Sequence, residues 1–393
     1  MEYRPYFLAR EWVRLGHSVS IAASSYSHLR MSNPAVTKRI TEEMIDGIRY
    51  IWLKCPVYKR NGVSRMLNMY GFYFGLKKHA ETLAGMVNPD IIIASSTYPM
   101  DTYPAQKMRK LSGAKLVHEV HDLWPLSLIE VSGASPKNPF IKMLGRAEDS
   151  AYTNSDYVVS FFINGFEYMK NHGLTADRLL YIPNGVDVNA WESNAETVPD
   201  EYSGLLSGLK SDGWFLLGYA GGHTVSNALD ILLDASEKLR DKKIKIILVG
   251  KGSEKDRLVK KAAERGLENI IFLDEVKNAY VKNLLGYFDA LYIGWNPLPL
   301  YRFGICANKL FDYMMSGKPI VHAFDYDSDP VSIAGCGITV PSGDIDGIAA
   351  AIEGVLGLPP DERKSMGEKG IAYVKENHSY EKLAEKLIDS VEL

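Results

Sequence analysis

Lys309 and Asp312 place a cation and a carboxylate three residues apart at the beginning of a short predicted helix. On a helix, side chains at this spacing lie on one face. The N-terminal end of a helix carries unpaired backbone N–H groups and a partial positive charge, which together suit a phosphate group. We therefore expect Lys309 to bind a diphosphate and Asp312 to bind ribose hydroxyls. The alternative is a surface ion pair on an ordinary helix.

A second group of ionisable residues, Glu119, His121 and Asp122, lies at the end of a predicted strand, residues 115–120. Ligands of open α/β sheets bind at the carboxyl ends of the strands. A single His or Asp at such a place would more often be structural, but three polar side chains this close together favour function. We predict that this group is catalytic.

The helix that carries Lys309 follows a predicted strand at 290–295 and a Pro-rich loop, and precedes another strand at 319–321. Apolar residues with helical spacing at 310–314 give it a buried face. Asn308 is a plausible N-cap, and Gly317 stands where a glycine commonly follows a helix. The stretch therefore reads as one βα repeat of an α/β sheet.

The whole chain alternates strands and helices in two successive sets, separated by a stretch rich in Asn, Ser, Pro and acidic residues. This pattern predicts two Rossmann-like α/β domains. The predicted divisions are a first domain at 1–190, a linker at 191–212, a second domain at 213–378 and a C-terminal helix at 379–393. Packing of that last helix against the first domain is one option.

The composition excludes several classes of protein. The 393 residues are 46% hydrophobic and 24% charged, with a net charge of −3, which argues against nucleic acid as a partner. The three cysteines lie far apart and without metal-ligand spacing, so we expect reduced thiols in a cytoplasmic protein. No apolar run reaches the length of a membrane span.

Four motifs in order resemble family 4 of the retaining, nucleotide-sugar-dependent glycosyltransferases, which have the GT-B fold. They are Ile182-Pro-Asn-Gly-Val-Asp187, Gly221-Gly222, Val249-Gly-Lys-Gly252 and the run from Lys309 to Pro319. Glu119-Val-His-Asp-Leu-Trp-Pro125 and Asn308-Lys309 are similar to the WbuB-like branch, which builds O-antigen and capsule. The resemblance covers nearly the whole chain and implies two Rossmann-like domains that face each other across a cleft.

The resemblance also implies a donor site. Asp312 stands where the family has the second Glu of its E-x7-E motif, and Gly304 stands where it has the first. The backbone amides from Gly304 to Cys306 would face the donor sugar or phosphate instead. The implied donor-site residues are Gly221, Gly222, Gly250, Lys251, Arg302, Gly304, Ile305, Cys306, Asn308, Lys309 and Asp312.

This chain departs from the family at two positions beside the first glycine loop. Many members have an Arg and a Lys there that reach the diphosphate, where this chain has Gly222 and Asn227. Other cations must then bind the diphosphate in their place. Lys309 is the best candidate, followed by Arg302 and Lys251. In the first domain, the resemblance places His121 near the reacting sugar.

The implied activity is retaining transfer of a hexose or N-acetyl-amino sugar from a nucleotide-sugar, with UDP as the expected nucleotide, to a polyprenyl-diphosphate-linked glycan. The catalytic residues would be His121, Asp122, Glu119 and Lys309, with neither a metal nor a cofactor. Asp325-Tyr-Asp327 resembles a metal motif of another fold, but we interpret it as a solvated acidic loop. The alternatives are a nucleotide-sugar epimerase and a non-catalytic sugar-nucleotide-binding protein.

Residues 58–79 hold Lys59, Arg60, Arg65, Lys77 and Lys78 among the aromatic residues Tyr70, Phe72, Tyr73 and Phe74. Basic amphipathic segments with aromatics favour anionic membrane surfaces, which a lipid-linked acceptor would require. We therefore expect a peripheral contact with the inner face of the cell membrane. The alternative is a helix whose aromatics are core and whose lysines are simply solvated.

The chain begins with a predicted helix at 2–16, whereas sheets of this type normally begin with a strand. We expect a gap in the first sheet where that strand would lie. This gap leads to the hypothesis that the native protein is longer. A poorly stable or inactive variant is the alternative.

Overall fold

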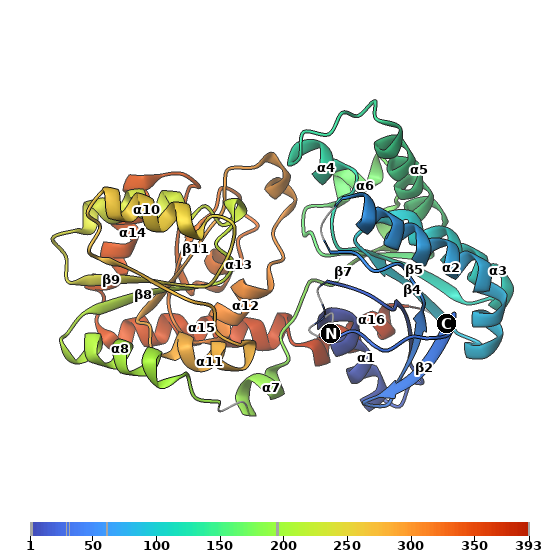
Figure 1. Ribbon diagram of the computed structural model, residues 1–393, viewed down its shortest axis with the longest axis horizontal. Coiled ribbons are helices and arrows are strands. Elements are labelled where there is room, and N and C mark those ends of the chain that lie inside the picture. The colour runs from blue at the N-terminus through green and yellow to red at the C-terminus, as the bar shows by residue number, and fades with distance from the viewer. Residues whose placement is uncertain (1–2, 29, 31, 60–61, 194–195, 392–393) are drawn as a thin grey trace. The chain divides into compact units, whose positions relative to one another are not determined.

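The computed structural model divides the chain into two compact units (Figure 1). The first contains Met1–Asn184 and Tyr380–Leu393, and the second contains Gly185–Ser379. The residues that the structure describes are 3–28, 30, 32–59, 62–193 and 196–391. Each unit is a layered α/β structure, and each is treated separately below.

The second unit is built on one six-stranded parallel sheet, in the order β10-β9-β8-β11-β12-β13. The strands are β8 (Phe215–Ala220), β9 (Ile244–Val249), β10 (Ile270–Leu273), β11 (Ala290–Gly294), β12 (Ile320–Ala323) and β13 (Gly337–Val340). The central strands are almost wholly buried because helices cover both faces, and their runs of apolar residues are typical of such sheets.

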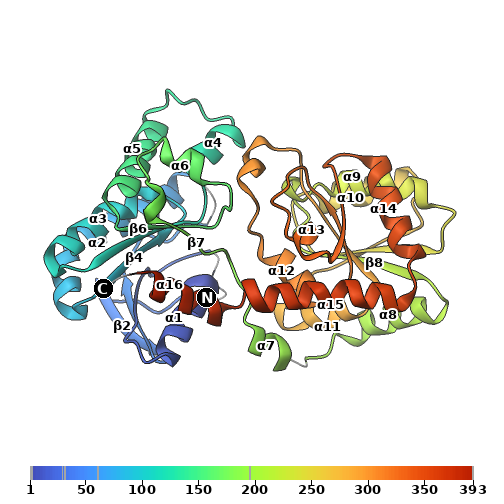
Figure 2. The same cartoon turned by 180° about the vertical axis from the view of Figure 1, so that it is seen from behind.

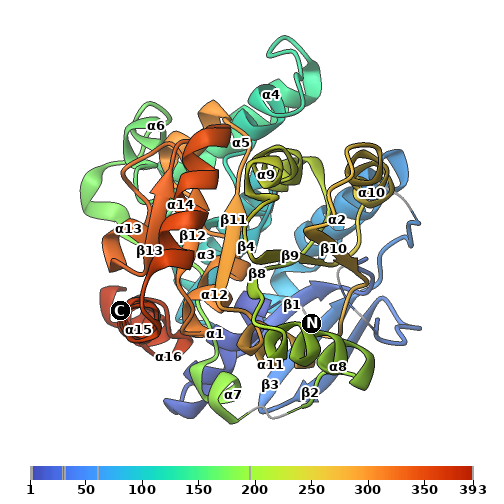
Figure 3. The same ribbon diagram turned by 90° about the vertical axis from the view of Figure 1, so that its left-hand side faces the viewer.

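Two apolar cores fill the two faces of this sheet (Figure 3). One core lies under α9 (Leu229–Ser236), α10 (Lys255–Glu264) and α14 (Ile345–Gly357). The other lies under α8 (Asp200–Ser211), α11 (Asn278–Gly286), α12 (Asn308–Met315) and α15 (Pro360–Asn377). Two short helices, α7 (Val188–Ser193) and α13 (Pro330–Ala334), complete the unit.

The order of the strands reverses at β8. From β8 the chain moves outward to β9 and β10 on one side, and then returns to place β11 on the other side of β8. In open α/β sheets, ligands bind at the carboxyl ends of the strands at such a switch point. The carboxyl ends of β8 and β11 are therefore the first place to look for a site.

The first unit contains two separate sheets, in the orders β1-β3-β2 and β4-β5-β6-β7. The strands are β1 (Ser20–Ser24), β2 (Ile40–Ile45), β3 (Ile48–Leu53), β4 (Ile91–Ser96), β5 (Lys115–Val120), β6 (Tyr157–Ser160) and β7 (Leu179–Tyr181). Within the described residues, β1 and β4 each pair on one side only. Both are partly exposed although they are apolar, whereas β3 and β5 are buried. An interrupted sheet is what the sequence predicts for this unit.

The helices of the first unit include α1 (Tyr3–Arg14), α2 (Val63–Val87), α3 (Thr102–Ser112), α4 (Leu126–Glu130), α5 (Pro139–Asn154) and α6 (Phe166–Lys170). The C-terminal helix α16 (Tyr380–Ser390) packs beside α1 (Figure 2). The Trp12 indole donates to the carbonyl of Ala384 at 3.0 Å, and the Phe7 and Tyr380 rings stack. Packing of the last helix against the first unit is therefore confirmed. No helix in the described ranges combines the length and apolarity that crossing a membrane requires.

Helix α8 and strand β2 are among the elements that differ from the sequence predictions. The stretch 191–212 was expected to be a linker, but α8 forms within it and Leu206 is fully buried in the core of the second unit. A narrow apolar stripe among Ser and Gly was enough, because tertiary packing supplies most of the stability of a helix. β2 was not predicted, since its Glu42 and Glu43 face solvent on an edge strand.

Candidate functional site

Helix α12 is held against the end of β8 by Tyr313. The hydroxyl of Tyr313 accepts from the backbone N–H of Ala220 at 2.7 Å and donates to the carbonyl of the same residue at 3.1 Å. Lys309 precedes Tyr313 by one turn of the helix, so it lies on the same face. Gly317 follows the helix in the left-handed conformation, as predicted, but the N-cap is Ala307, and Asn308 is the exposed first residue of the helix.

The ammonium of Lys309 lies between two aromatic rings. Its Nζ is 5.2 Å from the centroid of the Tyr219 ring and 4.9 Å from that of Trp295. Nζ donates to Oδ1 of Asn227, and the Tyr219 hydroxyl is 3.4 Å away. Tyr219 belongs to β8, and Trp295 directly follows β11, so this cage lies at the switch point of the sheet.

Lys309 has no carboxylate partner. Across the described parts of the chain, no Asp or Glu lies within ion-pair distance of its Nζ, and the surface-ion-pair alternative is therefore wrong. Burial without a counter-ion lowers the pKa of the Lys309 ammonium to about 7. A buried, uncompensated cation of this kind attracts an anionic ligand, and perturbed groups in such positions are candidates for functional sites.

Asp312 lies on the same face of α12 and is also uncompensated. Burial raises the pKa of its carboxyl to about 7, and no ionisable or hydrogen-bonding group in the described structure offsets that effect. The side chain keeps partial exposure. A carboxylate that is desolvated but still reachable can accept hydrogen bonds from the hydroxyls of a ligand.

Gly222 and Asn227, the two uncharged positions beside the first glycine loop, shape the cage around Lys309. The carbonyl of Gly222 accepts from the Tyr219 hydroxyl at 2.8 Å and from Nδ2 of Asn227 at 2.7 Å. These bonds orient the Asn227 amide so that its oxygen points to Lys309. Lys309 of α12 thus brings a cation to the first glycine loop. The spacing of residues in the sequence does not reveal this contact.

The second glycine loop packs directly on the first. A Cβ on Gly250 would lie 1.9 Å from the carbonyl oxygen of Gly221, and the backbone of Gly250 has a φ of +154°, so this position requires glycine. Lys251, in contrast, is exposed and pairs with Glu275 at 2.5 Å. The structure therefore brings Gly221, Gly222 and Gly250 together but turns Lys251 outward.

The loop before α12 is only partly as expected. Gly304 has a φ of +106°, which favours glycine, but its N–H donates to the carbonyl of Tyr301 at 2.9 Å and so is not offered to a ligand. Ile305 is buried and Cys306 is partly buried. Arg302 stacks on the neighbouring Phe303 ring and donates to Pro299, so it is not part of the Lys309 cage.

Glu119, in the first unit, is a buried carboxylate with a full set of partners. Nε and Nη2 of Arg4 donate to Oε1 at 2.9 and 2.7 Å, and Ser95 donates to Oε2 at 2.6 Å. Burial alone would raise the pKa of Glu119, but Arg4, His121 and Ser95 outweigh that effect and hold the pKa well below its usual range. Because the one proton of the Ser95 hydroxyl is committed to Glu119, His121 Nε2, 2.9 Å from Ser95, must carry a proton.

Asp122 has both carboxylate oxygens engaged in its own loop. They accept from the Trp124 indole at 3.0 Å and from the Ser127 hydroxyl at 2.6 Å. This geometry gives Asp122 a loop-organising part, and its catalytic role stays a prediction. Asp101, which the sequence did not single out, is buried close to Glu119, and burial raises its pKa to about 7. Its Oδ1 has no hydrogen-bond partner in the described structure.

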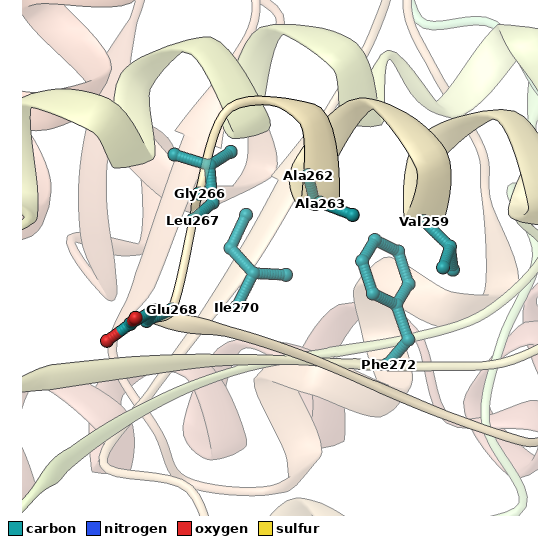
Figure 4. Close-up of a pocket in the computed structure, with 8 residues that line it drawn as sticks. All are labelled: Val259, Ala262, Ala263, Gly266, Leu267, Glu268, Ile270 and Phe272. Atoms are coloured by element: carbon teal, nitrogen blue, oxygen red, sulfur yellow. The ribbon is translucent and has the colours of Figure 1, made fainter.

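A recess of about 350 Å³ lies elsewhere in the second unit, between α10 and β10 (Figure 4). It is lined by Val259, Ala262, Ala263, Gly266, Leu267, Glu268, Ile270 and Phe272. None of the predicted site residues reaches this recess, and its lining is almost wholly apolar. It offers no ionisable group for chemistry beyond Glu268.

Two family models match the chain, one to each unit. The model described as Glycosyltransferase Family 4 matches residues 1–190, and the model described as Glycosyl transferases group 1 matches residues 215–357. A curated relative, described as the putative colanic acid biosynthesis glycosyl transferase WcaI of Escherichia coli, is 24% identical over 274 residues. That match covers 67% of this chain and 65% of the relative, slightly less than two thirds of its length.

Solved structures share the fold at low identity. Sucrose-phosphate synthase from Thermosynechococcus elongatus has a TM-score of 0.72 at 15% identity, over 97% of this chain and 90% of that one. Anabaena Alr3699/HepE, solved in complex with UDP, has a TM-score of 0.65 at 18% identity, over 87% and 85%. The two Rossmann-like units, the ordered motifs and the family models agree: the chain belongs to the family 4 glycosyltransferases and has the GT-B fold.

Proposed function

We propose that this protein is a retaining hexosyl- or N-acetyl-aminosugar transferase that uses a UDP-sugar and a lipid-linked glycan acceptor in bacterial surface polysaccharide biosynthesis. The observation that carries the proposal is the buried ammonium of Lys309, which lacks a counter-ion at the switch point of the second unit. The diphosphate of a nucleotide-sugar would supply that counter-ion. The relative named for colanic acid biosynthesis supports a role in polysaccharide biosynthesis. The fold shared with a protein solved in complex with UDP supports UDP as the nucleotide of the donor.

The proposed reaction needs charge stabilisation at the leaving group. The bond between the anomeric carbon and the diphosphate oxygen breaks, and its electron pair leaves with the nucleoside diphosphate. The acceptor oxygen bonds to the same face of that carbon, and its proton passes to the leaving phosphate. Lys309 would stabilise the charge that develops on the diphosphate, while Asp312 would hold the ribose hydroxyls. This scheme uses neither a metal nor a cofactor.

In the first unit we assign acceptor binding to the group around Glu119. His121 is half-buried and held by Ser95 and Glu119, so its ring is fixed in direction beside the Phe161 ring at 4.5 Å. A fixed, partly exposed imidazole can orient an acceptor hydroxyl. Glu119 itself, paired with Arg4, would act through His121 rather than on the substrate.

Helix α2 supports the proposed membrane contact. Val63, Leu67 and Phe74 are 74%, 56% and 59% exposed, and their spacing puts them on one side of the helix. Lys77 and Lys78 follow one turn later. Tyr70 and Tyr73 instead pack on Met100 and Leu144, so part of the segment is core. Arg60 lies outside the described residues.

Membrane contact has its own test. Sedimentation with vesicles that contain a tenth to a third of anionic lipid should deplete the parent protein from solution, and the double variant Leu67→Ser, Phe74→Ser should remain soluble. Neutral vesicles serve as the control for electrostatic attraction. Equal sedimentation of both proteins would contradict the assignment of this surface.

Calorimetric titration of UDP into the parent and into Lys309→Met tests the donor site. Loss of a charged hydrogen-bonding group should weaken binding by about 1.5–3 kcal/mol, or roughly tenfold to a hundredfold. A folded parent that binds neither UDP nor GDP would overturn the proposal. UDP binding without sugar transfer to a polyprenyl-diphosphate-linked acceptor would instead favour the alternative of a non-catalytic sugar-nucleotide-binding protein. The glycine at position 304, where the family has a Glu, already suggests that alternative.

A further inference from the structure

A chain of buried hydrogen bonds begins at Asp329 and ends at Trp295. Nε1 of Trp295 lies 2.9 Å from Nε2 of His322, and Nδ1 of His322 lies 2.7 Å from Oδ1 of Asp329. The exposed fractions of Trp295, His322 and Asp329 are 7%, 0% and 1%. Trp295 directly follows β11, His322 belongs to β12 and Asp329 is the N-cap of α13, so these hydrogen bonds link two neighbouring strands of the sheet to a helix.

Elementary hydrogen-bond chemistry fixes the direction of this chain. An indole N–H can only donate, so Nε2 of His322 must be an unprotonated acceptor. The ring proton is then on Nδ1 and is donated to Asp329. Asp329 also accepts from the backbone N–H groups of Val331 and Ser332 and from the hydroxyl of Thr339. The carboxylate is therefore anchored, and the anchored imidazole in turn fixes the indole.

The indole at the end of this chain forms one wall of the Lys309 cage. Its ring centroid is 4.9 Å from Nζ, and the Tyr219 ring at 5.2 Å forms the other wall. An indole free to rotate about its side-chain torsions would expose Nζ to water. The ammonium would then take up a hydration shell that a diphosphate must displace again.

We propose that Trp295, His322 and Asp329 form a positioning relay that holds the indole against Lys309 and thereby keeps its ammonium dehydrated and aimed for the diphosphate of the donor. This inference rests on the proposed function for the identity of the ligand. The three residues would act on the donor through Lys309, so we assign them as positioning residues.

The relay predicts a specific pattern among variants of His322. His322→Asn keeps a donor near the Nδ1 position for Asp329 but has no acceptor for the indole. His322→Gln extends an amide oxygen toward the Nε2 position and keeps that acceptor. We expect UDP affinity to fall about fivefold in His322→Asn, the scale of the difference between a desolvated and a solvent-exposed cation–π contact, and to fall less than twofold in His322→Gln.

A nucleotide-free readout separates this proposal from the proposed function. The rate at which Lys309 is modified by an amine reagent, followed by peptide mass spectrometry across pH, reports the pKa of its ammonium. Burial holds that pKa near 7 in the parent. The Tyr219 hydroxyl lies 3.4 Å from Nζ, and Asp312 and Tyr313 follow Lys309 on the same face of α12; every variant retains all three. We expect the modification midpoint to move upward in His322→Asn, because Nζ becomes hydrated, and to stay in place in His322→Gln.

The outcomes are distinct. An upward shift in His322→Asn alone supports the relay even where UDP does not bind, in which case only the proposed function fails. An unchanged midpoint in His322→Asn, or equal effects of both substitutions, would overturn the relay in favour of a purely structural network. Where His322→Asn does not fold, Trp295→Phe removes the N–H but keeps an aromatic ring, and the relay predicts the same upward shift there.

Discussion

The two units each bury an ionised side chain next to the carboxyl end of a sheet, but they treat that charge in opposite ways. Glu119 in the first unit is matched by the guanidinium of Arg4 and by Ser95 and His121. Lys309 in the second unit has two aromatic rings and one amide oxygen. A compensated charge serves the fold, whereas an uncompensated one raises the free energy of the empty protein and is relieved by a ligand of opposite charge.

The largest expected effect comes from breaking the compensated pair. Arg4→Met leaves Glu119 buried without its counter-ion, which should lower the free energy of unfolding by about 3–5 kcal/mol. Urea-induced unfolding measures this difference. The matched control is Arg49→Met, which breaks a surface pair with Glu42 and should cost at most about 1 kcal/mol.

The same measurement on Lys309→Met should show no loss of stability, because the substitution removes an unpaired cation from a desolvated place. A stability loss in Lys309→Met as large as that in Arg4→Met would mean that the two charges are not treated differently. The contrast between a compensated Glu119 and an uncompensated Lys309 would then be wrong.

A smaller effect is expected from giving Lys309 the partner that it lacks. Asn227→Asp changes the amide oxygen that Lys309 contacts into a carboxylate of the same shape. The new ion pair competes with the diphosphate, so UDP binding should weaken by about 1–2 kcal/mol. Asn227→Gln retains an amide without charge and is the control. Unchanged affinity in Asn227→Asp would show that the ammonium is not where the phosphate binds.

The sequence predicted the elements that carry the site better than it predicted the partners within it. The βα repeat around Lys309, its Gly317 terminus and the glycine loops follow from local periodicity and turn chemistry, which nearby residues decide. The pairing of Arg4 with Glu119 joins residues 115 positions apart, and that of Trp295 with His322 joins residues 27 apart. Whether a charged side chain is compensated depends on such contacts, so spacing alone could not separate Lys309 from a surface ion pair.

Two differences between the predictions and the structure have the same origin. The polar composition of residues 191–212 predicts a linker, but a few buried contacts, such as that of Leu206, stabilise helix α8 within it. Lys251 follows a glycine loop as a phosphate ligand would, yet it turns outward to Glu275. In both cases packing, which local sequence does not show, decided which side chains were buried.

The pH dependence of stability tests a further uncompensated group of the second unit, Asp312. Asp312 has a native pKa of about 7 against 3.8 for the free side chain, so between about pH 4 and 7 the native state holds a proton that the unfolded chain has lost. Stability from this group is therefore full below pH 4 and falls as the pH rises to 7. Asp312→Asn should flatten that dependence by about 1 kcal/mol per pH unit. Urea unfolding at pH 4.5, 6 and 7.5 checks it, and parallel curves for the two proteins would contradict it.

The smallest expected effect concerns the other lysine near the glycine loops. Lys251 is 74% exposed and already paired with Glu275, so its charge is screened by solvent and by its partner. Lys251→Ala should therefore change the dissociation constant for UDP by less than about twofold, when measured by the same calorimetry as Lys309→Met. A loss equal to that of Lys309→Met would mean that the outward-turned ammonium also reaches the phosphate. Burial without compensation would then be no guide to which cation binds the donor, and the contrast between Glu119 and Lys309 would describe folding alone.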